Sequence, residues 1–221
     1  MAMMSSVSVQ GYSGSSLVAD PIPVLPALQG LLPGGLPRGQ VLTVDAAGAL
    51  PLALVAGAVP AGVPTVDLWC AVVGLPESGM LAAAGMGANL DRLVLVDRPR
   101  ERWPDVVATL LSAAGLVLVQ PPGPPPAGII RRLTALARQH GAALVVVGHW
   151  EGARLRLQVT SSLWTGLEHG HGHLQGRRVK VVADGRGAGG RPRSAWLWLP
   201  GPDGSVAGAD LGVVESLEAA G

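Results

Sequence analysis

The chain has 221 residues, of which 48% are hydrophobic and only 14% charged, with 32 glycines, 19 prolines and a formal net charge of +1. This composition is long and apolar enough for one domain with a sizeable core, and it excludes a disordered polar chain. The single cysteine, Cys70, excludes an internal disulfide and a metal site built from several cysteines.

Three regions are expected along the chain: a flexible N-terminal tail over 1–20, one domain over 21–200 and an acidic C-terminal tail over 201–221. No stretch reaches the roughly 18 uninterrupted apolar residues that suggest a membrane span. The first residues also lack the charged and apolar regions of a signal peptide. We therefore expect a cytoplasmic protein that does not contact a membrane.

The proline- and glycine-rich residues 21–39 predict an extended, turn-rich lead-in. After it, apolar stretches that lack polar alternation predict five strands, at 40–45, 65–73, 93–97, 116–120 and 144–147, the first of them buried. The segments between the strands predict four helices, at 51–58, 80–84, 104–114 and 127–140.

The pattern changes after Trp150, because residues 154–159 and 178–181 alternate between polar and apolar, and 196–199 forms a further strand. Such strands are typical of a half-exposed antiparallel sheet. The fold class expected is therefore α/β: a mainly parallel sheet flanked by helices and extended by antiparallel C-terminal strands.

Read in this order, the chain resembles the RecA ATPase core over about residues 30–200. Residues 34–41 (GGLPRGQV) are similar to the lead into its first core strand, and 178–182 with 195–199 are similar to its last core strands. The resemblance implies a RecA-like core, and with it a nucleotide-binding loop after the first strand.

That loop lacks the side chains that bind nucleotide phosphates and magnesium. A phosphate-binding loop needs a lysine and then a serine or threonine at the start of its helix, and here Ala49 and Leu50 occupy those places. The fourth strand ends in Gln120 where an acid would support magnesium. We therefore expect no catalysis and no cofactor. The two long loops with which RecA proteins hold single-stranded DNA are also missing after the fourth and fifth strands.

A small RecA-like scaffold of this kind is similar to the ImuA family, including its actinobacterial ImuA-prime branch. The likeness is carried by residues 163–177 (LWTGLEHGHGHLQGR) and by Arg191-Pro192-Arg193 before a Trp-Leu-Trp-Leu-Pro strand. It implies an accessory subunit of an inducible, error-prone translesion-synthesis complex. The implied partners are an ImuB-like inactive Y-family polymerase and an error-prone DnaE-type polymerase.

Charge is unevenly distributed along the chain. Residues 131–193 hold eleven basic residues against three acids, whereas residues 194–221 hold four acids and no base. Such a basic block is typical either of a solvated face or of a surface for a partner or for DNA phosphates. The candidates for this basic rim are Trp164, Arg177, Arg178, Lys180, Arg186, Arg191 and Arg193.

Three further features of the sequence are a row of histidines, the single cysteine and a pair of tryptophans. His169, His171 and His173 alternate with glycines, which favours a polar loop over a zinc site. Cys70 lies in an apolar strand and is expected to be an inert buried thiol. Trp196 and Trp198 share one face of a strand, which either points inward to fill the core or points outward as an aromatic anchor for a partner, and we favour the inward orientation.

The main hypothesis is a non-catalytic scaffold that acts through protein–protein contacts. Its exposed sheet edge, or residues 17–28, would pair with a partner or with a second copy of the chain. The alternatives are a DNA-binding accessory protein that uses the basic block, a residual nucleotide binder, and a cell-division inhibitor of the SulA type, which shares the general scaffold.

Overall fold

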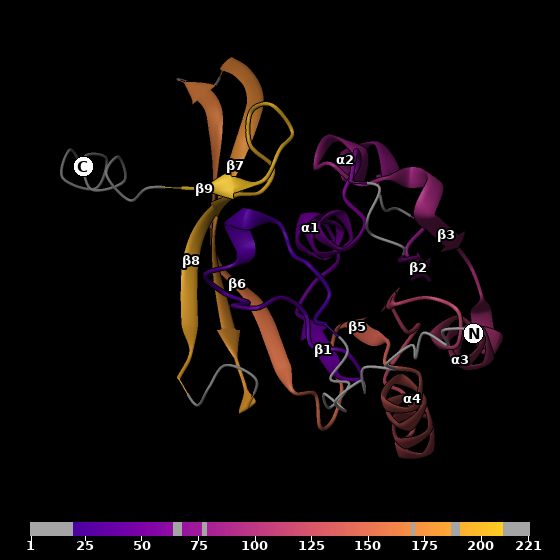
Figure 1. Cartoon of the computed structure of the whole chain (residues 1–221). Coiled ribbons are helices and arrows are strands. Elements are labelled where there is room, and N and C mark those ends of the chain that lie inside the picture. The colour runs from indigo at the N-terminus through magenta and orange to yellow at the C-terminus, as the bar shows by residue number, and fades with distance from the viewer. Residues whose placement is uncertain (1–19, 64–67, 77–78, 169–170, 187–190, 210–221) are drawn as a thin grey trace, which may run out of the picture.

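A computed structural model of the protein describes residues 20–63, 68–76, 79–168, 171–186 and 191–209. Within these ranges the chain forms one nine-stranded sheet with the order β3-β2-β4-β5-β1-β6-β7-β8-β9 (Figure 1). The first five strands of the order pair in parallel, and the last four are joined by antiparallel pairing. The predicted fold class is therefore confirmed.

The parallel half has a buried centre, and its strands are β1 (Val41–Val44), β2 (Cys70–Val73), β3 (Leu93–Val96), β4 (Leu116–Val119) and β5 (Ala143–Val147). Successive residues of a strand point to opposite faces. Accordingly Leu116 and Leu118 belong to one hydrophobic cluster, and Val117 and Val119 to the other. Both faces are covered at β1, β2, β4 and β5, which therefore read as unbroken apolar runs, whereas Val94 and Leu95 of the edge strand β3 are exposed.

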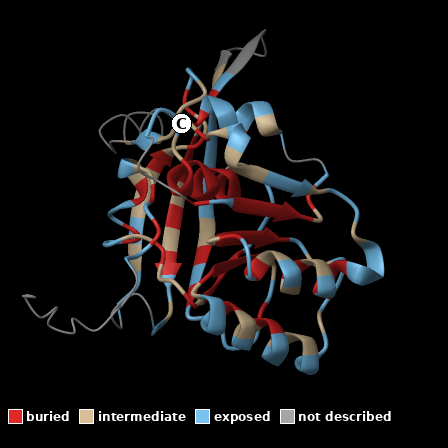
Figure 2. Ribbon diagram, turned by 45° about the vertical axis from the view of Figure 1, so that its right-hand side comes forward, coloured by how far each residue is buried: buried red, intermediate tan, exposed pale blue. Residues whose placement is uncertain are grey.

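The helices cover the two faces in pairs: α1 (Ala49–Ala58) and α2 (Met80–Gly85) on one, α3 (Trp103–Leu111) and α4 (Ala127–His140) on the other. In α3 and α4 one side is exposed, whereas nine of the ten residues of α1 are buried (Figure 2). A helix that is apolar all round belongs in a core. No helix in the described ranges is both long and apolar enough to cross a membrane.

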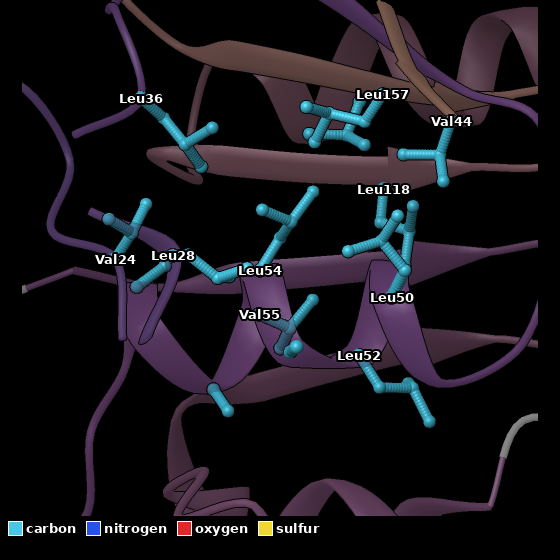
Figure 3. Packing of buried hydrophobic residues seen from close by; sticks show 14 of the residues in the cluster. Val24, Leu28, Leu36, Val44, Leu50, Leu52, Leu54, Val55, Leu118 and Leu157 are labelled. Carbon is cyan, nitrogen blue, oxygen red and sulfur yellow. The ribbon is translucent and has the colours of Figure 1, made fainter. Parts of the chain in front are cut away.

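The lead-in packs against α1, which also packs against the sheet. Residues 20–39 include a short 3₁₀ turn, η1 (Pro26–Leu28), and Ile22 exchanges two backbone hydrogen bonds with Leu36 at 2.9 and 2.8 Å. Val24, Leu28 and Leu36 pack near one end of α1, and Leu118 packs near the other end, beside Leu50 (Figure 3). Ile22, Val24 and Leu28 are therefore core, whereas Pro21, Pro23 and Pro26 are exposed, and pairing of 17–28 with a partner stays a prediction.

The C-terminal half is a long hairpin with two shorter strands beside it: β6 (Leu155–Glu168), β7 (His171–Asp184), β8 (Arg193–Trp198) and β9 (Ala207–Gly208). The start of β6 runs parallel to β1, with Leu42 facing Leu155, while β7 pairs with it in antiparallel fashion. The predicted antiparallel C-terminal strands are confirmed, and β6 joins them to the parallel half of the sheet.

Most predicted element positions agree with the structure to within a few residues. The predicted helix over 127–140 has the observed bounds of α4. The strand expected over 65–73 begins later, at Cys70, and residues 64–67 lie outside the described part. At the other end, Gly201 is buried and β9 pairs with β8, so the folded chain continues to residue 209. Two further 3₁₀ turns are η2 (Leu90–Arg92) and η3 (Arg100–Arg102).

Candidate functional site

The loop between β1 and α1 lies where a RecA-type protein would hold phosphate. Ala49 and Leu50 are the first two residues of α1, and Leu50 is buried in the core. A cavity of 320 Å³ beside this loop is lined by apolar and neutral residues that include Gly48, Leu52, Leu75 and Gln120. Among the described residues, the lining carries no cation to neutralise phosphate and no acid to support magnesium.

The one acid of the loop has a structural role. Asp45 follows β1, and its carboxylate accepts a hydrogen bond from the Val159 N–H at 3.0 Å. The Asp45 N–H in turn donates to the Leu157 carbonyl at 3.1 Å. These two bonds continue the contact between β1 and β6 beyond the end of β1, which explains why this loop begins with an acid.

The hairpin of β6 and β7 extends beyond the body of the sheet (Figure 1). Only Leu155–Leu157 of β6 pair with β1, and the rest of the strand pairs with β7 alone. A register shift between Val159 and Ser161 marks this change, as expected where a bulge increases the twist of a strand. Side chains on the outer part of the hairpin therefore have few neighbours.

Trp164 and Arg177 meet on this outer part. They face each other across the two strands, with the Arg177 guanidinium 5.7 Å from the centre of the Trp164 ring. The Arg177 Nε donates to the Ser162 hydroxyl at 2.7 Å, which holds the guanidinium in place. Trp164 remains 47% exposed and the adjacent Leu163 42% exposed. The Trp164–Arg177 pair is called the hairpin patch; Leu163 lies opposite Arg178 and therefore on the other face of the hairpin.

Arg178 and Lys180 point to the opposite face of β7, where the register places them across from Trp198 and Trp196. Arg178 is only 7% exposed, and its guanidinium lies 5.4 Å from the Trp198 ring centre. A buried arginine cannot reach a DNA backbone, so Arg178 is removed from the predicted contact surface. Lys180 is half-buried.

The expected inward orientation of Trp196 and Trp198 is wrong. Leu197 between them is buried and pairs with Val179, so the leucine face points into the core. Both tryptophans are half-buried on the outer face. Trp198 packs closely over Gly176, where an added Cβ would lie 3.0 Å from the ring.

The other predicted arginines lie at the far end of the hairpin from Trp164. Arg186 follows β7, Arg191 precedes β8, and both are exposed. Arg193 begins β8 opposite Ala183, the last pair of that ladder, and together with Arg154 it lines a cavity of 180 Å³. The predicted basic rim is therefore two separate groups, because neighbours in sequence are divided by the length of β7.

The histidines and the cysteine can be placed in part. His171 and His173 belong to β7, so the expected loop is wrong there, while His169 lies outside the described residues. No cluster of metal-ligating side chains is found in the described ranges. Cys70 is buried as predicted, and burial raises the pKa of its thiol to about 12.

Two features were missed by the sequence reasoning. Trp69 is 42% exposed with the Arg92 guanidinium 5.5 Å from its ring centre, which repeats the Trp164–Arg177 arrangement at the opposite side of the sheet. A second cavity lies where β2, β3 and β4 end. The rule that open α/β sheets bind ligands at the carboxyl ends of their strands would have indicated it.

Three comparisons with known proteins bear on this arrangement. The model of the MT3502 N-terminal domain family matches residues 30–152. The uncharacterized protein Rv3395c of Mycobacterium tuberculosis is 32% identical over 199 residues, which cover 83% of this chain and 88% of the relative. The crystal structure of the RadB recombinase superposes with a TM-score of 0.57 at 16% identity, over 84% of this chain and 97% of that chain. This last likeness confirms the predicted RecA-like fold.

Proposed function

Because the chain belongs to the MT3502 N-terminal domain family and has a RecA-like fold, we propose that it is a non-catalytic accessory subunit of an error-prone translesion-synthesis complex. It acts by protein–protein contact. Its partners are an ImuB-like inactive Y-family polymerase and an error-prone DnaE-type polymerase. The narrower assignment is supported by the ImuA-like residues 163–177 and 191–199, the first of which cover the hairpin patch.

The single observation that carries this proposal is the hairpin patch. Tryptophan and arginine are the residues most enriched among those that dominate binding energy at protein interfaces. Here the Trp164 ring is half exposed, yet it is held by Arg177, which is itself fixed by Ser162. A side chain that is already held in place loses less conformational entropy when a partner covers it.

The β1–α1 loop supports the non-catalytic half of the proposal. Ala49 and Leu50 provide no charge and no metal ligand at the start of α1. The Asp45 carboxylate already accepts a hydrogen bond from the β6 backbone. A role that needs no nucleotide is compatible with this loop.

The test compares two matched pairs of residues. Trp164→Ala with Arg177→Ala removes the hairpin patch, and Trp69→Ala with Arg92→Ala removes a similar pair at the opposite edge of the sheet. We expect the hairpin variant to bind the ImuB-like polymerase at least about tenfold more weakly, and the control to bind like the wild type. Calorimetric titration measures both affinities, and thermal unfolding confirms that both variants fold.

Wild-type affinity in the hairpin variant would contradict the proposed surface. An equal loss of affinity in both variants would also contradict it, because the effect would then not belong to the hairpin.

The exposed arginines at the other end of the hairpin favour a second candidate, contact with DNA phosphates. In that case fluorescence anisotropy with a single-stranded oligonucleotide would show an affinity that falls steeply with salt. Arg191→Glu with Arg193→Glu would abolish it. The same double variant leaves the hairpin patch intact and should bind the polymerase normally.

A further inference from the structure

A cavity of 490 Å³ opens at the carboxyl ends of β2, β3 and β4, next to the smaller cavity at the β1–α1 loop. Its polar lining consists of Asp97, Arg98, Arg100 and Gln120, and four prolines form much of the remainder. The volume lies within the range of about 300–1,000 Å³ that is typical of small-ligand pockets.

The topology of the sheet accounts for the position of this cavity. β2 and β4 are neighbours, but the chain leaves β2 through α2 toward the edge strand β3, and leaves β4 through α4 toward β5. The two helices lie on opposite faces of the sheet, so the loops that follow the two strands part from each other. In open α/β sheets, such a point is where ligands bind.

One wall of the cavity is formed by backbone in close contact, and another contains a strained residue. Gly74 has a φ of +74°, and an added Cβ would lie 2.5 Å from the Gln120 carbonyl oxygen, so the loops after β2 and β4 touch through backbone. Arg100 has a φ of +51°, the one positive value among the described non-glycine residues. An arginine is unfavourable in this conformation, and strained residues of this kind cluster at functional sites.

The charged groups of the cavity are not used inside the protein. Asp97, Arg98 and Arg100 are exposed, and no hydrogen bond or ion pair joins their side chains to the described part of the chain. By contrast, Arg132 on α4 is paired with Asp105 at 2.9 Å. The two guanidinium groups and one carboxylate give the cavity a net positive charge, which favours binding of an anion. Arginine also matches the geometry of carboxylate and phosphate groups.

We propose that this cavity binds a small organic anion that carries a carboxylate or phosphate group. Arg98 and Arg100 hold the anionic group, Gln120 and Asp97 take hydrogen bonds from the rest of the molecule, and the prolines cover its apolar part. The site is separate from the hairpin patch, so the proposal goes beyond the scaffold role. It can be tested independently of that role.

The test uses the full chain, labelled with ¹⁵N, and amide chemical shifts. The probes are inorganic pyrophosphate and phosphoenolpyruvate for the phosphate group, citrate and glutamate for the carboxylate, and glycerol as the neutral control. We expect at least one anion to give saturable shifts at Gly74, at Asp97, Arg98 and Arg100, and at Gln120. Glycerol should give none, and the probe that binds identifies the anionic group.

Arg100→Gly separates binding from folding. Glycine accepts the positive φ, so this variant should unfold at a higher temperature than the wild type while it loses the shifts. Arg98→Gln should reduce the affinity about tenfold or more and leave the unfolding temperature unchanged.

Three outcomes would overturn the proposal: no saturable shift with any anion, shifts centred on Arg186 and Arg191 instead, or undiminished binding in Arg100→Gly. None of them depends on whether the chain binds a polymerase.

Discussion

Gly57 shows at the scale of one residue how the lead-in and α1 depend on each other. A Cβ at this position would lie 2.5 Å from the Leu25 nitrogen and 2.7 Å from the Val24 Cα. Both contacts are with backbone, which cannot move aside as a flexible side chain can. The lead-in reaches the buried helix α1 this closely because residue 57 has no side chain.

We therefore predict that Gly57→Ala destabilises the protein by about 1–3 kcal/mol, as overpacked cores do. This sign is opposite to the usual gain of roughly 0.5–1 kcal/mol when alanine replaces glycine in a helix. Gly128→Ala in α4 is the matched control, because nothing lies within 4 Å of an added Cβ there. Urea unfolding measures both, and a stabilised Gly57→Ala would show that the close packing of the lead-in on α1 is incorrect.

At the scale of the element, local signals explain what could be predicted. The bounds of α4 follow from Pro126 before it and from Gly141 after it, which adopts the left-handed conformation that ends a helix. The orientation of β6 could not be predicted, because it depends on pairing with β1 more than a hundred residues away. The face of Trp196 and Trp198 was equally ambiguous, since both sides of that strand are apolar and the register with β7 decides between them.

The end of α4 provides a test at this scale. Gly141 has a φ of +65° with open space around it, so Gly141→Ala should cost about 1–2 kcal/mol through the backbone alone. Gly141→Asn should cost less, because asparagine tolerates this conformation. Equal stability of the wild type and Gly141→Ala in urea unfolding would contradict the assigned cap.

At the scale of the whole molecule, the candidate site was only partly predictable. The missing nucleotide chemistry at Ala49, Leu50 and Gln120 could be identified in sequence because those positions are defined by their distance from a strand or helix. The surface formed by the basic rim could not be predicted from the sequence, because it depends on which strand residues share a face and how far apart they lie. In the structure Trp164 contacts Arg177, and Arg178 is buried. The remaining predicted arginines lie at the other end of the hairpin: Arg186, Arg191 and Arg193.

The central claim is that this RecA-like domain acts by protein contact and without nucleotide. Its most direct test is titration of the chain with the ImuB-like polymerase, with and without ATP and magnesium. The account predicts a stable complex of equal affinity in both conditions. A complex that forms only with ATP and magnesium, or no complex in either condition, would contradict it.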